Sequence, residues 1–198
     1  MLRLTDVVKQ LLIINAILFI ISSLPIYQSL PDLALYFPGS SQFRPYQLVT
    51  YMFMHGNLSH IFFNMLMLVT FGPMLESFWG SKRFLFYYLF CGLGAVACHI
   101  LFWYYEAAGL APGQSMGSVV GASGALFGIL VAYGMYFPDQ QLMLLIPPIP
   151  MKAKYLVVFC IILELVMIGG GAQSNVAHFA HLGGALFGFL LILYWRKK

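Results

Sequence analysis

Charged residues are scarce in this sequence. Ten Lys and Arg and six Asp and Glu make up 8% of the 198 residues, whereas 61% are hydrophobic. A soluble domain usually carries about 25% charged residues. The shortage of charge therefore excludes an ordinary soluble domain and predicts an integral membrane protein. The net charge of +4 does not indicate nucleic-acid binding, because the basic residues are distributed as a membrane topology requires.

The sequence also lacks metal-binding motifs. Its three cysteines, Cys91, Cys98 and Cys160, lie inside apolar stretches without C-x-x-C or other metal-type spacing. We interpret them as small core residues. No H-E-x-x-H motif and no paired aspartates occur, which disfavours metal-assisted proteolysis. We expect neither a metal ion nor another cofactor.

Apolar stretches long enough to cross a bilayer recur along the chain. A spanning helix needs roughly 17–25 residues, and the length allows six such helices plus loops. We predict one all-α polytopic membrane domain over residues 1–198, a compact bundle of six transmembrane helices. The expected spans are 11–27, 60–79, 84–105, 121–137, 152–169 and 176–195. No small-x-small cleavage site follows the first span, so we expect it to be retained.

The segment 28–58 separates the first two predicted spans and is rich in proline and aromatic residues. Tyrosine at this density is typical of a membrane–water interface. We predict a membrane-embedded loop, with a short amphipathic helix between residues 45 and 55.

The basic residues indicate the orientation. Six spans place both termini on one side, where nine of the ten Lys and Arg fall, and Arg44 alone falls opposite. The positive-inside rule therefore predicts that both termini are cytoplasmic.

Helix rise places several polar residues at one depth. At ~1.5 Å per residue, Ser123 lies ~22 Å above Pro138-Asp139, and His181 lies ~21 Å above Trp195. On the second span, Asn64 is ~24 Å and His60 ~30 Å above the cytoplasmic end. Polar residues inside a membrane are functional candidates. The count predicts a water-filled pocket that opens to the extracytoplasmic side.

A serine hydroxyl becomes nucleophilic when a neighbouring base takes its proton. We predict that Ser123 is the nucleophile and that His181 is the base. His60, Asn64 and the backbone at Gly121 suit an oxyanion site.

Other side chains lie near the predicted base. Phe127, one turn below Ser123, could stack on the imidazole of His181. Glu76 lies near the cytoplasmic end, and Glu164 lies near mid-bilayer on another helix. We therefore expect no carboxylate as a third member and predict a Ser–His dyad.

Small residues line two of the predicted spans. Gly121, Gly124 and Gly128 recur on the fourth span, and Ala180, Gly184 and Gly188 on the sixth. Such faces let helix backbones approach closely. They predict close packing between these helices, which a hydrogen bond from serine to histidine requires.

Two further histidines could line the site. His178 lies nearly one turn before His181, and a rival assignment makes it the base, although the Gly184/Gly188 register favours His181. His55 is expected to brace the junction of the loop and the second span. Glu164 is an ionisable residue in mid-membrane that we expect to be bonded to a neighbour, and it could tune a gate at the fifth span.

Three motifs now allow a comparison with a known family. They are HIFFN at 60–64, GASG at 121–124 and AHLGGALFG at 180–188. In their order and their placement on the second, fourth and sixth predicted spans, they resemble the signature motifs of the rhomboid intramembrane serine proteases. The resemblance covers essentially the whole chain and matches the minimal six-helix bacterial form.

The resemblance implies an activity and a location. Its members cleave transmembrane segments of other membrane proteins near their outer ends, so we expect transmembrane protein substrates, a lipid bilayer as surroundings and no nucleic acid. The expected location is a bacterial cytoplasmic membrane. Many members carry Trp-Arg in the loop where this chain has Tyr46-Gln47, which leaves the anchoring of that loop open.

Two other functions compete with the protease. One is a catalytically inactive rhomboid-like binding protein, which the joint presence of Ser123, His181, His60 and Asn64 argues against. The other is a small six-helix transporter, which the lack of inverted-repeat hydropathy and of paired broken helices disfavours. The sequence leaves the oligomeric state and the natural substrate open.

Overall fold

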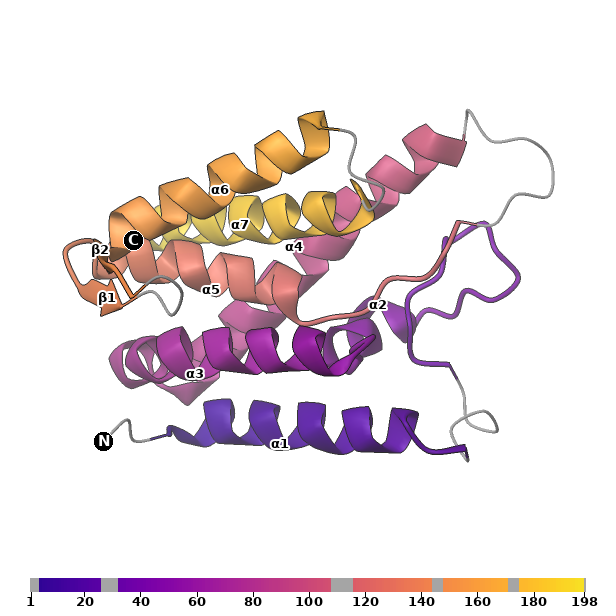
Figure 1. The fold of residues 1–198 in the computed structure, drawn as a ribbon, viewed down its shortest axis with the longest axis horizontal. Helices are drawn as coiled ribbons and strands as arrows, with labels where there is room; N and C mark the ends of the chain where they lie inside the picture. The colour runs from indigo at the N-terminus through magenta and orange to yellow at the C-terminus, as the bar shows by residue number, and fades with distance from the viewer. Residues whose placement is uncertain (1–3, 26–31, 108–115, 144–147, 171–174, 198) are drawn as a thin grey trace.

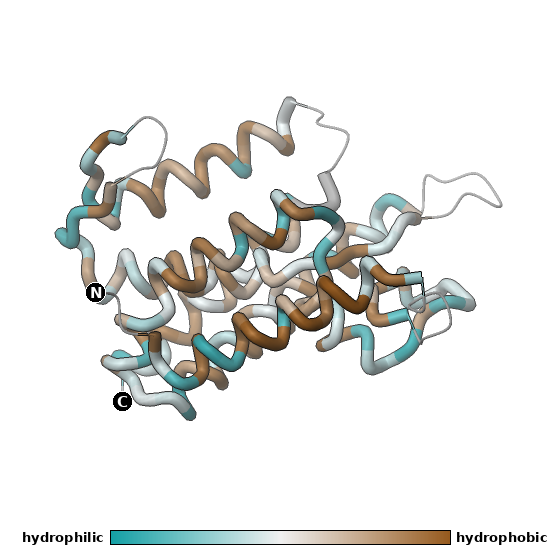
Figure 2. The backbone as a smooth tube through the Cα atoms, turned by 60° about the horizontal axis from the view of Figure 1, so that its bottom comes forward, coloured by the Kyte–Doolittle hydropathy of each residue, from teal (hydrophilic) through white to brown (hydrophobic). Residues whose placement is uncertain are grey.

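The computed structural model describes residues 4–25, 32–107, 116–143, 148–170 and 175–197. The last two residues of the first predicted span and most of the turn before the sixth lie outside these ranges. The described chain is mostly helical, as expected, and its long helices run side by side (Figure 1). Figure 2 shows hydrophobic residues along the helices and hydrophilic ones gathered in the loops.

Six long helices form the bundle in the described part of the chain. They are α1 (Asp6–Ser22), α3 (Leu58–Trp79), α4 (Ser81–Ala107), α5 (Ser123–Tyr136), α6 (Ala153–Gly169) and α7 (Asn175–Arg196). Short elements accompany them: α2 (Gln47–Thr50), a 3₁₀ turn (Tyr51–Phe53), and the strands β1 (Gln141–Met143) and β2 (Pro150–Lys152).

Three helical segments in the described ranges are long and apolar enough to cross a membrane, namely Leu58–Trp79, Ser81–Ala107 and His178–Arg196. Helices α1 and α6 have 17 residues each, and α5 has 14. The fold therefore has the helices of a polytopic membrane protein, whereas the number of spans stays a prediction.

The two strands were not expected. They form an antiparallel ladder in which Leu142 pairs with Met151, in the stretch that joins the fourth and fifth predicted spans. Asp139 lies beside the hairpin and accepts hydrogen bonds from Lys152 (3.1 Å) and Lys154 (2.9 Å). The fold is therefore not purely α-helical, because this loop closes on itself.

Helix α1 begins at Asp6, five residues before the first predicted span. Its free N-terminal amides are satisfied by a carboxylate from α3: Glu76 accepts hydrogen bonds from the backbone N–H groups of Val7 (2.9 Å) and Val8 (3.0 Å). An anion at a helix N-terminus stabilises the helix. The apolar pattern alone could not place this start, because the capping group is 68 residues away in the sequence.

Helix α5 is the centre of the bundle. It contacts α3, α4, α6 and α7, and every residue from 124 to 134 is buried. A helix that is apolar on all sides is buried on all sides. The N-terminus of α5 is thereby held within reach of side chains from α3 and α7.

Helices α5 and α7 touch through their backbones. A Cβ atom added to Gly184 would lie 1.8 Å from the carbonyl oxygen of Gly124. A Cβ on Gly128 would lie 3.0 Å from the carbonyl oxygen of Gly184 and 2.4 Å from Sγ of Cys91. No side chain fits between these helices at these positions, which fixes their separation.

The loop between α1 and α3 is anchored by Gln47, which is 1% exposed. Its amide donates to the carbonyl oxygens of Asp32 (3.1 Å) and Gln42 (3.2 Å), and its oxygen accepts from the N–H of Arg44 (3.0 Å). Gln47 therefore anchors this loop. The sequence alone had left open what anchors it at Tyr46-Gln47. A backbone bridge from Leu35 to the segment before α5 holds the loop against that segment.

Candidate active site

The turn before α5 presents Ser123. Gly121 has φ of +128°, a backbone conformation that residues other than glycine rarely adopt. Its N–H donates to the carbonyl oxygen of Tyr51 (2.9 Å). A Cβ on Gly121 would lie 2.7 Å from Nε2 of His60. Glycine is thus needed for both the turn and the close approach of His60.

The side chains of Ser123 and His181 meet across α5 and α7. Oγ of Ser123 lies 2.7 Å from Nε2 of His181. The imidazole stacks on Phe127, with ring centroids 4.5 Å apart and planes inclined by 5°. Phe127 is one turn after Ser123 on α5, so one helix positions both the hydroxyl and the aromatic support of the imidazole.

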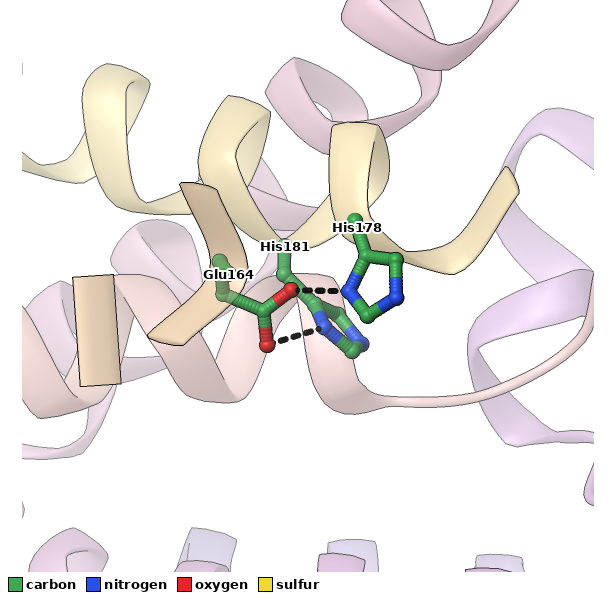
Figure 3. Close-up of side chains that lie close together, drawn as sticks. All are labelled: Glu164, His178 and His181. Atoms are coloured by element: carbon green, nitrogen blue, oxygen red, sulfur yellow. Dashed lines mark hydrogen bonds and ion pairs between the residues drawn. The ribbon is translucent and has the colours of Figure 1, made fainter. Parts of the chain in front are cut away.

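Glu164 approaches the other nitrogen of the same imidazole. Its Oε1 lies 3.0 Å from Nδ1 of His181, and its Oε2 lies 2.5 Å from Nδ1 of His178 (Figure 3). The prediction that no carboxylate is available to His181 is therefore wrong. Counted along α6 from Ala153, Glu164 lies ~17 Å up the helix, only a few ångströms below the depth predicted for His181. The two side chains bridge that difference.

A cavity of about 690 Å³ lies beside Ser123 and His181. Polar groups predicted for the oxyanion site line it: His60, Asn64 and Gly121. Asn64 is 3% exposed, and its amide nitrogen has no acceptor among the described residues. A buried donor without an acceptor is costly, so this amide is suited to a ligand oxygen.

The remaining predicted histidines lie outside the lining of this cavity. His55 is buried and packs edge-on against His60, with centroids 5.0 Å apart. Burial, and to a smaller extent the nearby His60, lowers the pKa of His55 from 6.5 to about 4. His178 is bound to Glu164 instead. Phe127, in contrast, lines the cavity beside Ser123.

The link from Glu164 to both histidines is the part of the site that sequence reasoning missed. Two signals pointed to it: an ionisable residue in an apolar helix is a functional candidate, and His178 and His181 are three apart and so lie on one face of α7. The sequence could not show that α6 turns Glu164 toward that face.

The same three residues are where a metal ion could be held. Glu164, His178 and His181 offer ligand atoms within 4.8 Å of one another. Two ligands about 2.0 Å from a tetrahedral zinc ion would be separated by about 3.3 Å. The contact of 2.5 Å between Glu164 and His178 is shorter and fits a direct hydrogen bond. The present arrangement is therefore that of a carboxylate bridging two imidazoles.

The geometry can be set beside known proteins. The family model for the Rhomboid domain matches residues 42–198. Rhomboid protease AarA of Providencia stuartii is 31% identical over 151 residues, which cover 71% of this chain and 52% of AarA. The mitochondrial Rhomboid protein 1 of Saccharomyces cerevisiae is 30% identical over 73% of this chain and 40% of its own length.

A third relative is matched almost from end to end. The putative rhomboid protease YdcA of Bacillus subtilis is 27% identical, and the match covers 99% of this chain and 92% of YdcA. The chain thus spans about half the length, or less, of the first two relatives and nearly all of the third. Since the family model covers most of the chain, this protein is an integral membrane protein that belongs to the rhomboid family.

Proposed function

We propose that this protein is an intramembrane serine endopeptidase that cleaves transmembrane segments of other membrane proteins. The observation that carries the proposal is the distance of 2.7 Å between Oγ of Ser123 and Nε2 of His181, at the wall of a cavity large enough for a peptide segment. The relatives, which include Rhomboid protease AarA, give independent support.

The first chemical step is acylation. Nε2 of His181 takes the hydroxyl proton of Ser123 as Oγ attacks the scissile carbonyl carbon. A C–O bond forms, and the π electrons of the carbonyl move onto its oxygen. Donors at Asn64, His60 and the backbone near Ser123 surround the volume where this oxyanion develops, and such donors stabilise it. The C–N bond then breaks as His181 returns the proton to the departing amine.

The second step is deacylation. A water molecule gives a proton to Nε2 of His181 and attacks the acyl carbon. The resulting intermediate collapses to a carboxylic acid, and Oγ of Ser123 regains its proton from His181. The cavity is what allows water to reach this carbon within a protein of such apolar composition.

We further propose the membrane arrangement predicted from the sequence, with six spans, an embedded loop before α3 and cytoplasmic termini. The start of α1 and the end of α7 lie at the same end of the bundle (Figure 1), where Thr5 contacts Glu76 and Trp79 packs on Trp195. Arg83 stacks on Trp195 at this end. Ser123 begins α5 and lines a cavity together with His60, near the start of α3 and away from Trp79 at its end, which supports a cavity open to the extracytoplasmic side.

The competing function is an inactive family member that binds transmembrane segments. Purified protein in vesicles, offered a single-span reporter with small residues near its outer end, separates the two. We expect the wild type to cleave the reporter and Ser123→Ala and His181→Ala to lose cleavage while keeping their fold and thermal stability. Binding of the reporter without cleavage by the wild type would favour the inactive binding protein.

A further inference from the structure

We propose that Glu164 of α6 is a positioning residue for the base His181, and that His178 holds the Glu164 carboxylate in place. The inference rests on the proposed function and adds a third group to the predicted dyad. A neutral imidazole can accept a proton at Nε2 only if its own proton is on Nδ1. The nearest acceptor for that Nδ1 proton is Oε1 of Glu164, at 3.0 Å.

The same geometry fixes the orientation of the ring. The imidazole of His181 is contacted on three sides: by Ser123 at Nε2, by Glu164 at Nδ1 and by Phe127 on its face. Rotation of the ring by 180° would place carbon atoms against both oxygen partners. Phe127 alone would permit this flip, because stacking does not distinguish the two orientations. The carboxylate therefore selects the tautomer and the orientation in which Nε2 acts as a base.

Both oxygens of the carboxylate are used. Oε2 lies 2.5 Å from Nδ1 of His178, and the Glu164 residue is 8% exposed. A buried charge is strongly unfavourable unless it is paired and hydrogen-bonded. His178 supplies the second donor, so its role is to keep Glu164 ionised and directed at His181.

Glu164 is one of the few buried residues of α6. Ala153 and Glu164 are the buried residues among the described positions of α6. The apolar neighbours Leu163 and Leu165 are 47% and 54% exposed. On the two preceding turns, Val157, Cys160 and Ile161 pack against a cluster from α5 and α7. Glu164 lies on the same face of α6 as these residues. A carboxylate therefore occupies a position at which an apolar side chain would be expected.

Several ionisable groups face this site. His60, from α3, interacts electrostatically with His181, and Cys160 lies one turn before Glu164 on α6. Ser123 faces the imidazole from α5, and His178 shares α7 with it. Glu164 is the acidic residue of this set. A substitution at Glu164 therefore removes the carboxylate partner of His181 and leaves the other groups in place.

The test compares Glu164→Gln with the wild type, with Leu165→Ala as a control on the exposed face of α6. We expect Glu164→Gln to lower kcat by about 10²-fold with little change in KM. Leu165→Ala should match the wild type in both. An unchanged kcat in Glu164→Gln would overturn the proposal.

A second pair covers the case in which Glu164→Gln does not fold. His178→Gln keeps a side-chain donor near Oε2, whereas His178→Leu has none. We expect His178→Gln to keep most of the activity and His178→Leu to lose about tenfold in kcat, since loss of a hydrogen bond to a charged group is costly. Equal activity of the two variants would show that His178 does not hold the Glu164 carboxylate in place.

The outcomes also separate this inference from the proposed function. Loss of cleavage in Ser123→Ala together with a fully active Glu164→Gln would leave the protease and remove the role of Glu164. Cleavage that survives in Ser123→Ala would overturn both. Inactivation of the wild type by EDTA, with recovery on adding Zn²⁺, would mean that the three residues hold a metal, contrary to the proposal.

Discussion

The backbone of Gly184 on α7 lies directly against the carbonyl group of Gly124 on α5, so that a Cβ on Gly184 would be 1.8 Å from that oxygen. Gly124 follows Ser123, and Gly184 follows His181 by three residues. The close approach of these two glycines therefore sets the distance between the hydroxyl and the imidazole.

This relationship predicts the effect of one methyl group. Gly184→Ala must separate α5 from α7, because the atom it meets is backbone and cannot rotate away. We expect a loss of about 3 kcal/mol of stability, the upper part of the range for overpacked cores, and a large loss of activity. Thermal unfolding and reporter cleavage measure the two effects. The matched control is Gly56→Ala, whose Cβ would meet nothing within 4 Å; equal behaviour of the two variants would contradict the account.

A second prediction concerns Asn64. Its amide nitrogen is buried at the cavity without an acceptor in the described chain, so it is free to donate to an oxyanion. Asn64→Ala should lower kcat by about 10²–10³-fold, as loss of an oxyanion donor does, with a small change in KM. The comparison is Met67→Leu, an apolar change in the same cavity lining. A fall in kcat of similar size in Met67→Leu would argue against a specific role for the amide.

A third prediction concerns the end of the bundle far from Ser123. Glu76 accepts hydrogen bonds from Val7, Val8 and Ser81 and holds α1 against α3. Glu76→Ala should lower stability by about 2–4 kcal/mol, because it removes hydrogen bonds to a charged group and leaves helix amides unpaired. Protease protection of α1 should fall, while kcat at a temperature below unfolding should stay near the wild-type value. A large drop in kcat in a folded Glu76→Ala protein would contradict this separation of roles.

Features that depend on composition and short motifs could be predicted from the sequence, whereas contacts between side chains on different helices could not. The apolar stretches and the membrane class depend on composition, and the family resemblance depends on short motifs, so both were accessible from the sequence. The start of α1 and the contact of Glu164 with His181 depend on carboxylates that meet partners on other helices. A dyad was predicted because Glu164 was placed near mid-bilayer on another helix, and the local sequence around Glu164 does not reveal which way α6 turns.

A fourth prediction is a pH dependence of stability. The pKa of His55 is lowered from 6.5 to about 4 by burial and by His60, so the unfolded chain binds this proton more readily than the folded one. The contribution of His55 to the free energy of unfolding is fully present above about pH 6.5 and is lost as the pH falls toward 4. The full loss is on the order of 3 kcal/mol.

His55→Gln tests the origin of that loss. We expect the variant to lose less thermal stability than the wild type between pH 7 and pH 4.5, because its side chain does not titrate. The comparison is between the two slopes, since the substitution also changes stability at neutral pH. Parallel slopes would mean that other groups cause the pH dependence.

The central claim is that Ser123 is an activated nucleophile whose hydroxyl is deprotonated by His181. Labelling of the purified protein with a fluorophosphonate, read by intact mass and peptide mapping, tests it most directly. The account predicts one adduct on Ser123 in the wild type, no adduct in Ser123→Ala, and strongly slowed labelling in His181→Ala. An adduct that persists in Ser123→Ala, or labelling of His181→Ala at the wild-type rate, would contradict it.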